Sequence, residues 1–84
     1  MMKSVPVRID DIQVPMKFKG LLDPAKAAAL AEDILANGQK TPIQVRRDEK
    51  AKRYVLVSGL HRLEALRSLG EATVDALIVA ARKF

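Results

Sequence analysis

The chain has 84 residues, 49% of them hydrophobic, with 15 Lys and Arg against 10 Asp and Glu. This length supports one modest core, so we expect residues 1–84 to form a single domain. The net charge of +5 favours anionic partners such as nucleotides, nucleic acid or acidic protein surfaces, without choosing among them. Because the chain has no cysteine and one histidine, disulfides, thiolate metal sites and thiol catalysis within it are excluded.

The sequence offers no membrane segment. No apolar run approaches the roughly 18 to 20 residues that cross a bilayer, and the first residues lack the apolar stretch of a signal peptide. We therefore expect a cytoplasmic protein with no membrane partner. Met1 at one end, and a strand followed by Arg82 and Lys83 at the other, favour a small intact protein.

The first segments are short. Residues 5–9 and 12–14 alternate apolar and polar side chains, which predicts a short strand followed by a turn. Pro6 and Pro15 favour an edge position or strand ends. Residues 16–22 show no sustained periodicity and contain a glycine, so we expect a loop with two cationic side chains.

A helix is predicted over residues 24–36. Asp23 stands directly before Pro24, the pattern of an N-cap followed by proline at the first helical position. Asn37 and Gly38 supply a typical helix stop. The residues at the spacing of a buried helical face are Ala27, Leu30, Ala31, Ile34 and Leu35.

The second half of the chain predicts strands at 42–46 and 54–57, joined by a solvated hairpin loop at 47–53. A second helix is expected over 60–69 and a final strand over 74–79. The core-facing residues of that helix are Leu63, Leu66 and Leu69, with Gly70 as its cap. The order of these helices and strands along the chain predicts a compact α+β domain with a mixed sheet of about four strands and two main helices.

Residues 58–62, Ser-Gly-Leu-His-Arg, join a predicted strand to the second helix. Gly59 allows a tight turn or a close approach, and the N–H groups near residues 60–62 can hold phosphate oxygens. Arg62 adds a charged fork, while His61 can donate a hydrogen bond or move a proton near neutral pH. The same residues also fit a plain glycine turn with a half-buried His and a surface Arg. No Walker A or GxGxxG sequence is present, so any nucleotide site is of another kind.

The segment from Lys40 to Arg53 is basic. It fits either a solvated loop or a nucleic-acid contact, and the pattern leaves both open. The residues that would make that contact are Arg46, Arg47, Lys50, Lys52 and Arg53.

Over residues 5–80 the chain resembles the ParB/sulfiredoxin superfamily. Residues 22–26, 42–45 and 58–62 are similar to the sulfiredoxin landmarks L-D-P-x-K, P-I-x-V and G-C-H-R. In ParB amino-terminal domains, the strand-to-helix turn that corresponds to residues 58–62 usually has the sequence Gly-Glu-Arg-Arg and binds the phosphates of a nucleotide. Both branches therefore imply a nucleoside triphosphate, ATP or CTP, with or without magnesium.

The resemblance implies positions for this site. Lys26, His61 and Arg62 match positions that contact ATP phosphates in sulfiredoxins, and Gly59 matches the turn glycine. With Ser58 of the same turn, these are the five predicted nucleotide-binding residues. Two other nucleotide-contacting hydroxyl positions of sulfiredoxins fall at Ala29 and Asp33, where this chain departs from the family. Leu60 occupies the place of the sulfiredoxin cysteine, and reduction of a sulfinic acid by that route needs a thiolate. The resemblance therefore implies the fold without the reductase chemistry.

Three functions follow as hypotheses. The first is a nucleotide-binding, ParB-like regulatory module. The alternative is a DNA-associated protein of partition or transcription type; because the chain holds no helix-turn-helix or dimerisation segment, specific recognition would need a partner or a dimer. The second alternative is a nucleotide hydrolase or phosphotransferase assisted by His61 or a neighbouring carboxylate such as Glu64, or a ParB-like nuclease, although the sequence shows no carboxylate cluster for metal-assisted phosphodiester cleavage. A protein partner and the oligomeric state are left open.

Overall fold

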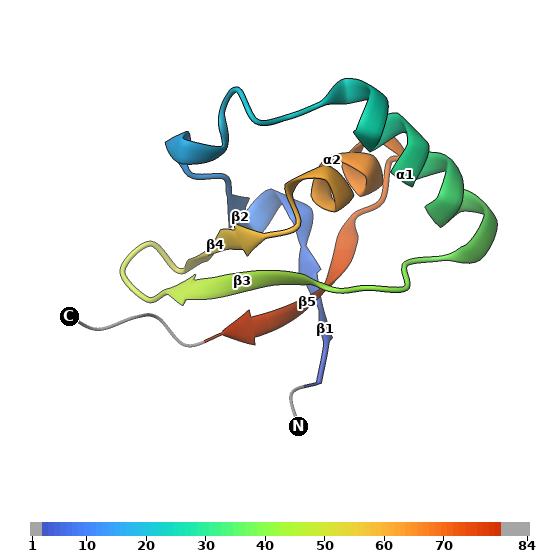
Figure 1. The fold of residues 1–84 in the computed structure, drawn as a ribbon. Coiled ribbons are helices and arrows are strands. Elements are labelled where there is room, and N and C mark those ends of the chain that lie inside the picture. Colours follow the sequence, from blue (N-terminus) through green and yellow to red (C-terminus); the bar gives the residue numbers. More distant parts are fainter. Residues whose placement is uncertain (1–2, 80–84) are drawn as a thin grey trace.

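The computed structural model describes residues 3–79. In this part of the chain the strands are β1 (Val5–Arg8), β2 (Ile12–Gln13), β3 (Ile43–Asp48), β4 (Arg53–Ser58) and β5 (Thr73–Val79), and the α-helices are α1 (Pro24–Asn37) and α2 (Leu60–Ser68). Single turns of 3₁₀-helix lie at Ile9–Asp11 and Met16–Phe18. Figure 1 shows both α-helices on the same side of the sheet, with α2 between α1 and the strands.

The described strands form one mixed sheet in the order β1-β5-β3-β4-β2. The pairs β1/β5 and β3/β4 are antiparallel, and the pairs β3/β5 and β2/β4 are parallel. The predicted α+β fold with a mixed sheet is confirmed, but the described part has five strands rather than about four. The additional strand, β2, has two residues and pairs with Tyr54 and Val55 at the opposite edge from β1. The alternation at residues 12–14 is too short to distinguish a second strand from the turn that was predicted after the first, so only the pairing with β4 defines β2.

Pro6 lies in an edge strand, as predicted, and faces Asp75 of β5. The backbone N–H of Asp75 donates to Gln39 Oε1 at 2.9 Å, and its carbonyl accepts from Gln39 Nε2 at 3.0 Å. The hydrogen-bonding groups of Asp75 therefore point away from β1. Since no donor is required of residue 6 at this pair, proline is tolerated there.

The main core lies between α2 and the sheet. Its buried members include Ile43, Val45 and Leu56 from the strands and Leu60, Leu63, Ala65 and Leu66 from α2. Helix α1 buries only Ile34, and the prediction that Leu35 faces the core is wrong, because its side chain is 77% exposed. Since α1 packs mainly against one neighbour, α2, only a narrow stripe of it is covered. Among residues 3–79, none of the helices is both long and apolar enough to span a membrane.

The β3–β4 connection is shorter than predicted. Strand β3 continues to Asp48 and β4 begins at Arg53, so the turn takes only residues 49–52. Asp48 Oδ1 accepts from the backbone N–H groups of Lys50 at 3.1 Å and Ala51 at 3.3 Å, which closes the turn. The cross-strand pairing extends the strands into residues whose charges alone predicted a loop.

Candidate functional site

The turn between β4 and α2 requires glycine for two reasons. Gly59 has φ of 101°, a left-handed conformation that side chains disfavour. A Cβ added there would lie 2.7 Å from Ile43 Cγ2 and 2.9 Å from Ile43 Cβ. Because Ile43 is fully buried, it has no room to move away. The chain is thus held against β3 at the point where α2 begins.

Helix α2 begins without a side-chain cap. Its first helical hydrogen bond runs from the Leu63 N–H to the Gly59 carbonyl at 2.9 Å. The N–H groups of residues 60–62 therefore have no acceptor within the helix, and no described side chain caps them. Three donors and the positive end of the helix dipole are left at this point.

Helix α1 begins beside it. Its N-cap, Asp23, uses Oδ1 to accept from the N–H groups of Ala25 at 3.0 Å and Lys26 at 3.4 Å. The backbone N–H of Asp23 in turn donates to His61 Nε2 at 3.0 Å. His61 therefore connects the two helix starts. Since its Nε2 is an acceptor here, Nδ1 is the nitrogen that can donate to a ligand.

An open pocket of about 510 Å³ lies between these helices. Its lining residues are Lys26, Ala29, Leu30 and Asp33 from α1, and Gly59, Leu60, His61 and Arg62 from the start of α2. Four of the five residues implied for phosphate binding thus lie around one pocket, whereas Ser58, the last residue of β4, is outside this lining. The volume is in the range of small-molecule sites, roughly 300–1,000 Å³.

The two cations of the pocket, Lys26 and Arg62, form no ion pair with any residue that the structure describes. Leu30 is the lining residue that sequence analysis did not connect with this site; its spacing from Lys26 along one helical face was the available signal. Within residues 3–79, no three His, Cys, Asp or Glu side chains gather to hold a metal ion. The pocket therefore offers donors and positive charge to an anion.

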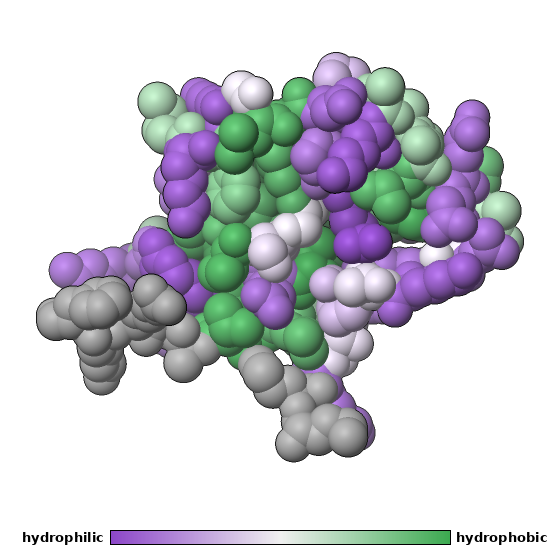
Figure 2. Space-filling model, in the orientation of Figure 1, coloured by the Kyte–Doolittle hydropathy of each residue, from purple (hydrophilic) through white to green (hydrophobic). Residues whose placement is uncertain are grey.

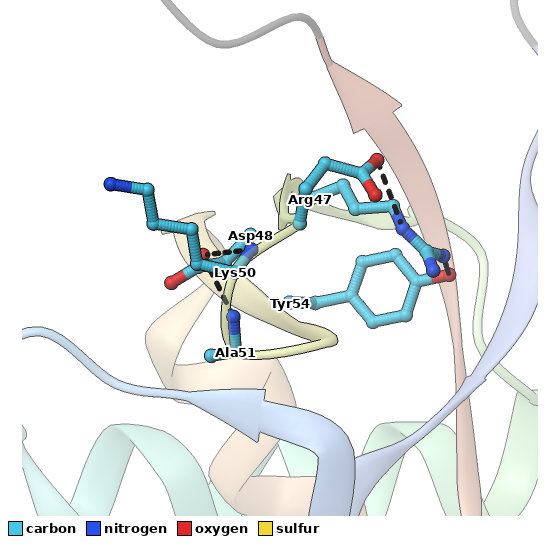
Figure 3. A network of polar contacts seen from close by, with 6 residues as sticks. Arg47, Asp48, Lys50, Ala51 and Tyr54 are labelled. Carbon is cyan, nitrogen blue, oxygen red and sulfur yellow. Dashed lines mark hydrogen bonds and ion pairs between the residues drawn. The ribbon is translucent and has the colours of Figure 1, made fainter.

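The basic hairpin is arranged differently, as Figure 3 shows for Arg47, Asp48 and Tyr54. Arg47 Nη1 donates to the Tyr54 hydroxyl at 3.2 Å, and its Nε lies 3.3 Å from Glu49 Oε1. Its guanidinium carbon is 5.5 Å from the centre of the Tyr54 ring. This arginine is therefore already engaged within the hairpin.

The other cations of the hairpin are spread around it. Arg46 and Arg47 are consecutive in β3, so their side chains leave opposite faces of the sheet. Arg53 is the register partner of Asp48, and Lys50 and Lys52 lie in the turn. Figure 2 shows hydrophilic residues around the outer end of this hairpin on the face in view. The structure thus places the five basic residues on one projecting element, without bringing them to one face.

A family model described as ParB N-terminal domain matches residues 2–83. The chain belongs to the ParB N-terminal domain family. No curated protein matches the sequence. The resemblance deduced from the three landmarks is thereby confirmed for this ParB N-terminal domain.

Solved structures share its fold. Sulfiredoxin from Arabidopsis thaliana matches with a TM-score of 0.82 and 28% identity, over 93% of this chain and 85% of that chain. The C-terminally truncated ParB from Caulobacter crescentus complexed with CTP-gamma-S matches with a TM-score of 0.81 and 24% identity, over 95% of this chain and 46% of that chain. A free serine kinase in complex with AMP matches with a TM-score of 0.78 and 20% identity, over 93% of this chain and 31% of that chain. This ParB N-terminal domain thus spans most of a sulfiredoxin, but less than half of the other two chains.

Proposed function

We propose that this domain is a regulatory module that binds a nucleoside triphosphate, ATP or CTP, with the phosphates at the start of α2. The observation that carries the proposal is the uncapped helix start at residues 60–62, which opens on a pocket with two cations that lack described partners, Lys26 and Arg62. Helix N-termini bind phosphate because their backbone donors and dipole favour negative charge.

Each group has a distinct role in the proposed complex. The N–H groups of residues 60–62 donate to phosphate oxygens, and the Arg62 guanidinium adds a charge-assisted fork. Lys26 supplies a point charge from the facing helix. His61 keeps the two helix starts together through Nε2 and donates from Nδ1. Magnesium, if present, is held mainly by the phosphates, as is usual for this ion in nucleotide sites.

Relatives with this fold support a nucleotide as the ligand. The ParB structure contains CTP-gamma-S, and free serine kinase structures contain AMP or ADP. The sulfiredoxin reaction is not proposed, because Leu60 stands where that family has its nucleophilic cysteine and the chain has none elsewhere.

The test is a titration of ¹⁵N-labelled domain with ATP, ADP, CTP and GTP, with and without magnesium. We expect saturable shifts at Lys26 and at residues 59–62. Arg62→Ala should weaken binding by about 10- to 100-fold, the usual loss for a hydrogen bond to a charged group, without unfolding the domain. Arg67→Ala is the matched control, since Arg67 is at the other end of α2 and outside this lining. Undiminished binding in Arg62→Ala would contradict the proposal.

A second candidate, association with DNA, is favoured by the basic hairpin. Lys50 and Lys52 in its turn are exposed and form no ion pair with described residues, so they are suited to phosphate contacts. Replacing both with Gln should lower the slope of log affinity against log salt by about one to two for a short duplex. Lys40→Gln is the control. No binding to the duplex at low salt would remove this candidate.

A further inference from the structure

A second open pocket, of about 370 Å³, lies between α2 and residues 14–22, the segment that leads from β2 to α1. On the side of α2 it is lined by Leu60, Glu64 and Arg67, which follow one face of the helix. Its lining shares Leu60 with the pocket of the proposed phosphate site. We call it the loop pocket, and a ligand there binds beside the phosphate site rather than in it.

The floor of the loop pocket consists of apolar side chains that belong to the core or pack against it. Leu60 is a core residue, and Val14 and Phe18 are partly buried against the core. Leu22 adds a fourth apolar side chain to the lining. An apolar side chain inserted here would replace water at the surface of the core, which is favourable because apolar surface is removed from water.

The wall formed by residues 14–22 is held in one shape by its own backbone. In its turn of 3₁₀-helix, the Phe18 N–H donates to the Pro15 carbonyl at 3.0 Å. The Lys19 N–H donates to the Met16 carbonyl at 3.0 Å, and the Leu21 N–H follows with a bond of 3.1 Å to the Phe18 carbonyl. Figure 1 shows this segment passing the start of α2 on its way to α1. A ligand therefore meets a wall that is already ordered, which reduces the entropy cost of binding.

Two large apolar side chains of the same segment are exposed to solvent. Met16 is 75% exposed and Leu21 is 62% exposed. Leu21 lies between Gly20 and Leu22, which both line the loop pocket. Figure 2 shows hydrophobic and hydrophilic residues side by side where this segment lies, at the upper left. Because exposed apolar side chains that gather beside a pocket mark interaction sites, this segment is suited to contact a partner.

The charge around the loop pocket is positive. Lys19 is one of its lining residues, and Lys17 Nζ lies 5.4 Å from the centre of the Phe18 ring. Neither lysine forms an ion pair with a residue that the structure describes. Glu64 and Arg67 pair with each other, with Arg67 Nε 3.9 Å from Glu64 Oε1, so they add no net charge. Charge complementarity therefore favours an acidic ligand.

We propose that the loop pocket docks an acidic segment of a partner protein. A large apolar side chain of that segment inserts against Phe18 and Leu60, and its flanking carboxylates lie beside Lys17 and Lys19. A bilayer surface offers no side chain to fill a concave pocket, and nucleic acid carries phosphates without an aliphatic side chain to cover the apolar floor. A protein segment supplies both chemistries. This interaction goes beyond nucleotide binding and does not depend on it.

The test titrates the ¹⁵N-labelled domain, without nucleotide, with the peptide Ac-Asp-Glu-Leu-Phe-Asp-Glu-NH₂. We expect saturable shifts at residues 18–22 and in α2 at Glu64 and Arg67, whereas the hairpin turn at 49–52 should not shift. The matched peptide with Asn and Gln in place of Asp and Glu should bind about 3- to 10-fold more weakly, as expected for two exposed ion pairs. A second matched peptide, with Ala in place of Leu and Phe, should bind at least about 10-fold more weakly, because it leaves the floor uncovered.

Charge variants of the domain test the role of the two lysines. Lys17→Gln combined with Lys19→Gln should reduce the preference for the acidic over the neutral peptide to about 1. Lys3→Gln combined with Lys40→Gln is the matched control, because it removes the same charge from exposed residues outside this lining. The control should keep the preference of the unmodified domain.

An apolar variant tests the floor. Leu22→Ser should weaken the binding of both the acidic and the neutral peptide by about 3- to 10-fold, because it removes apolar contact without changing the charge. Leu35→Ser is the matched control, since Leu35 is an exposed leucine of α1 outside this lining. Equal weakening in the two variants would overturn the assignment of the pocket.

Other results would also overturn the proposal. One is the absence of saturable shifts at residues 18–22 up to about 2 mM acidic peptide. Equal affinities for the acidic and neutral peptides are another, and so is a preference that survives in the double variant of Lys17 and Lys19. Shifts of residues 18–22 by phosphatidylglycerol vesicles or by a DNA duplex, without shifts by the peptide, would identify a membrane or nucleic acid as the partner instead. The nucleotide titration is separate, so failure of the proposed function leaves this result unaffected.

Discussion

The two helix starts lie side by side and are made in opposite ways. At α1, Asp23 caps the helix with its own carboxylate, and Pro24 removes one donor that would otherwise need an acceptor. At α2, Gly59 has no side chain to offer, and the donors of residues 60–62 are left without a cap. One N-terminus is closed by its own residues, and the other is open to a ligand.

The difference shows where each helix obtains its stability. Helix α1 buries a single residue, Ile34, so its local cap matters. Helix α2 buries Leu60, Leu63 and Leu66, each worth about 1.5–3 kcal/mol of apolar burial, and its start is held against Ile43. Because tertiary packing holds α2, its N-terminus can remain uncapped and available for an anion.

The largest expected effect is on the open helix start. Gly59→Ala combines a left-handed backbone with a contact of 2.7 Å to Ile43, so it should lower the free energy of unfolding by about 2–4 kcal/mol. Urea unfolding measures this loss. Gly70→Ala, with φ of 77° and nothing within 4 Å, carries only the backbone strain and should cost about 1 kcal/mol. Equal losses in the two variants would mean that Ile43 imposes no constraint on the turn.

Substitution at the capped N-terminus of α1 should reduce the free energy of unfolding by less than Gly59→Ala does. Asp23→Ala removes the acceptor for two backbone donors and should lower the free energy of unfolding by about 1–2 kcal/mol. Glu32→Ala, which removes the same charge from the middle of α1, is the control for net charge. A loss no greater than that of the control would show that the cap adds nothing to the stability of α1.

The hydrogen bond from the Asp23 N–H to His61 Nε2, which connects the two helix starts, should contribute less to the free energy of unfolding. His61→Ala removes the acceptor of the Asp23 N–H, which lies at an exposed residue, so the loss should be about 0.5–1 kcal/mol. Amide hydrogen exchange gives the sharper measurement, since the Asp23 amide should exchange faster while the core amides of β3 do not. Unchanged exchange at Asp23 would contradict the connection.

The smallest expected effect is the stabilisation by a small phosphate ligand, which directly compares the uncapped start of α2 with the capped start of α1. Inorganic pyrophosphate should shift the amide resonances of residues 60–62 and leave that of Ala25 in place, because the Ala25 N–H already donates to Asp23 Oδ1. At a concentration equal to Kd, the stabilisation is about 0.4 kcal/mol. Equal shifts at both helix starts would show that the cap on α1 does not distinguish them.

Local signals in the sequence predicted much of the fold. The start of α1 was predicted correctly, because Asp23 acts as a cap on donors only two or three residues away. The predicted end at residue 36 is one residue short, since α1 includes Asn37 before its C-cap, Gly38. The strand β2 was not recognised as separate, since it is defined by pairing with residues 42 positions later. The exposure of Leu35 was also missed, because the pattern shows a helical face but not how wide a neighbour covers it.

By itself the sequence determined the order of the two helices and of the strands other than β2, the glycine turn before α2 and the lack of a thiol nucleophile in these 84 residues. These depend on single residues and their near neighbours. Only the tertiary structure decided that Lys26 and Arg62 share one pocket and that His61 accepts from the Asp23 N–H across 38 positions. Such contacts join residues far apart in the chain, and they exist only once α1 has packed on α2 and the sheet has fixed the start of α2.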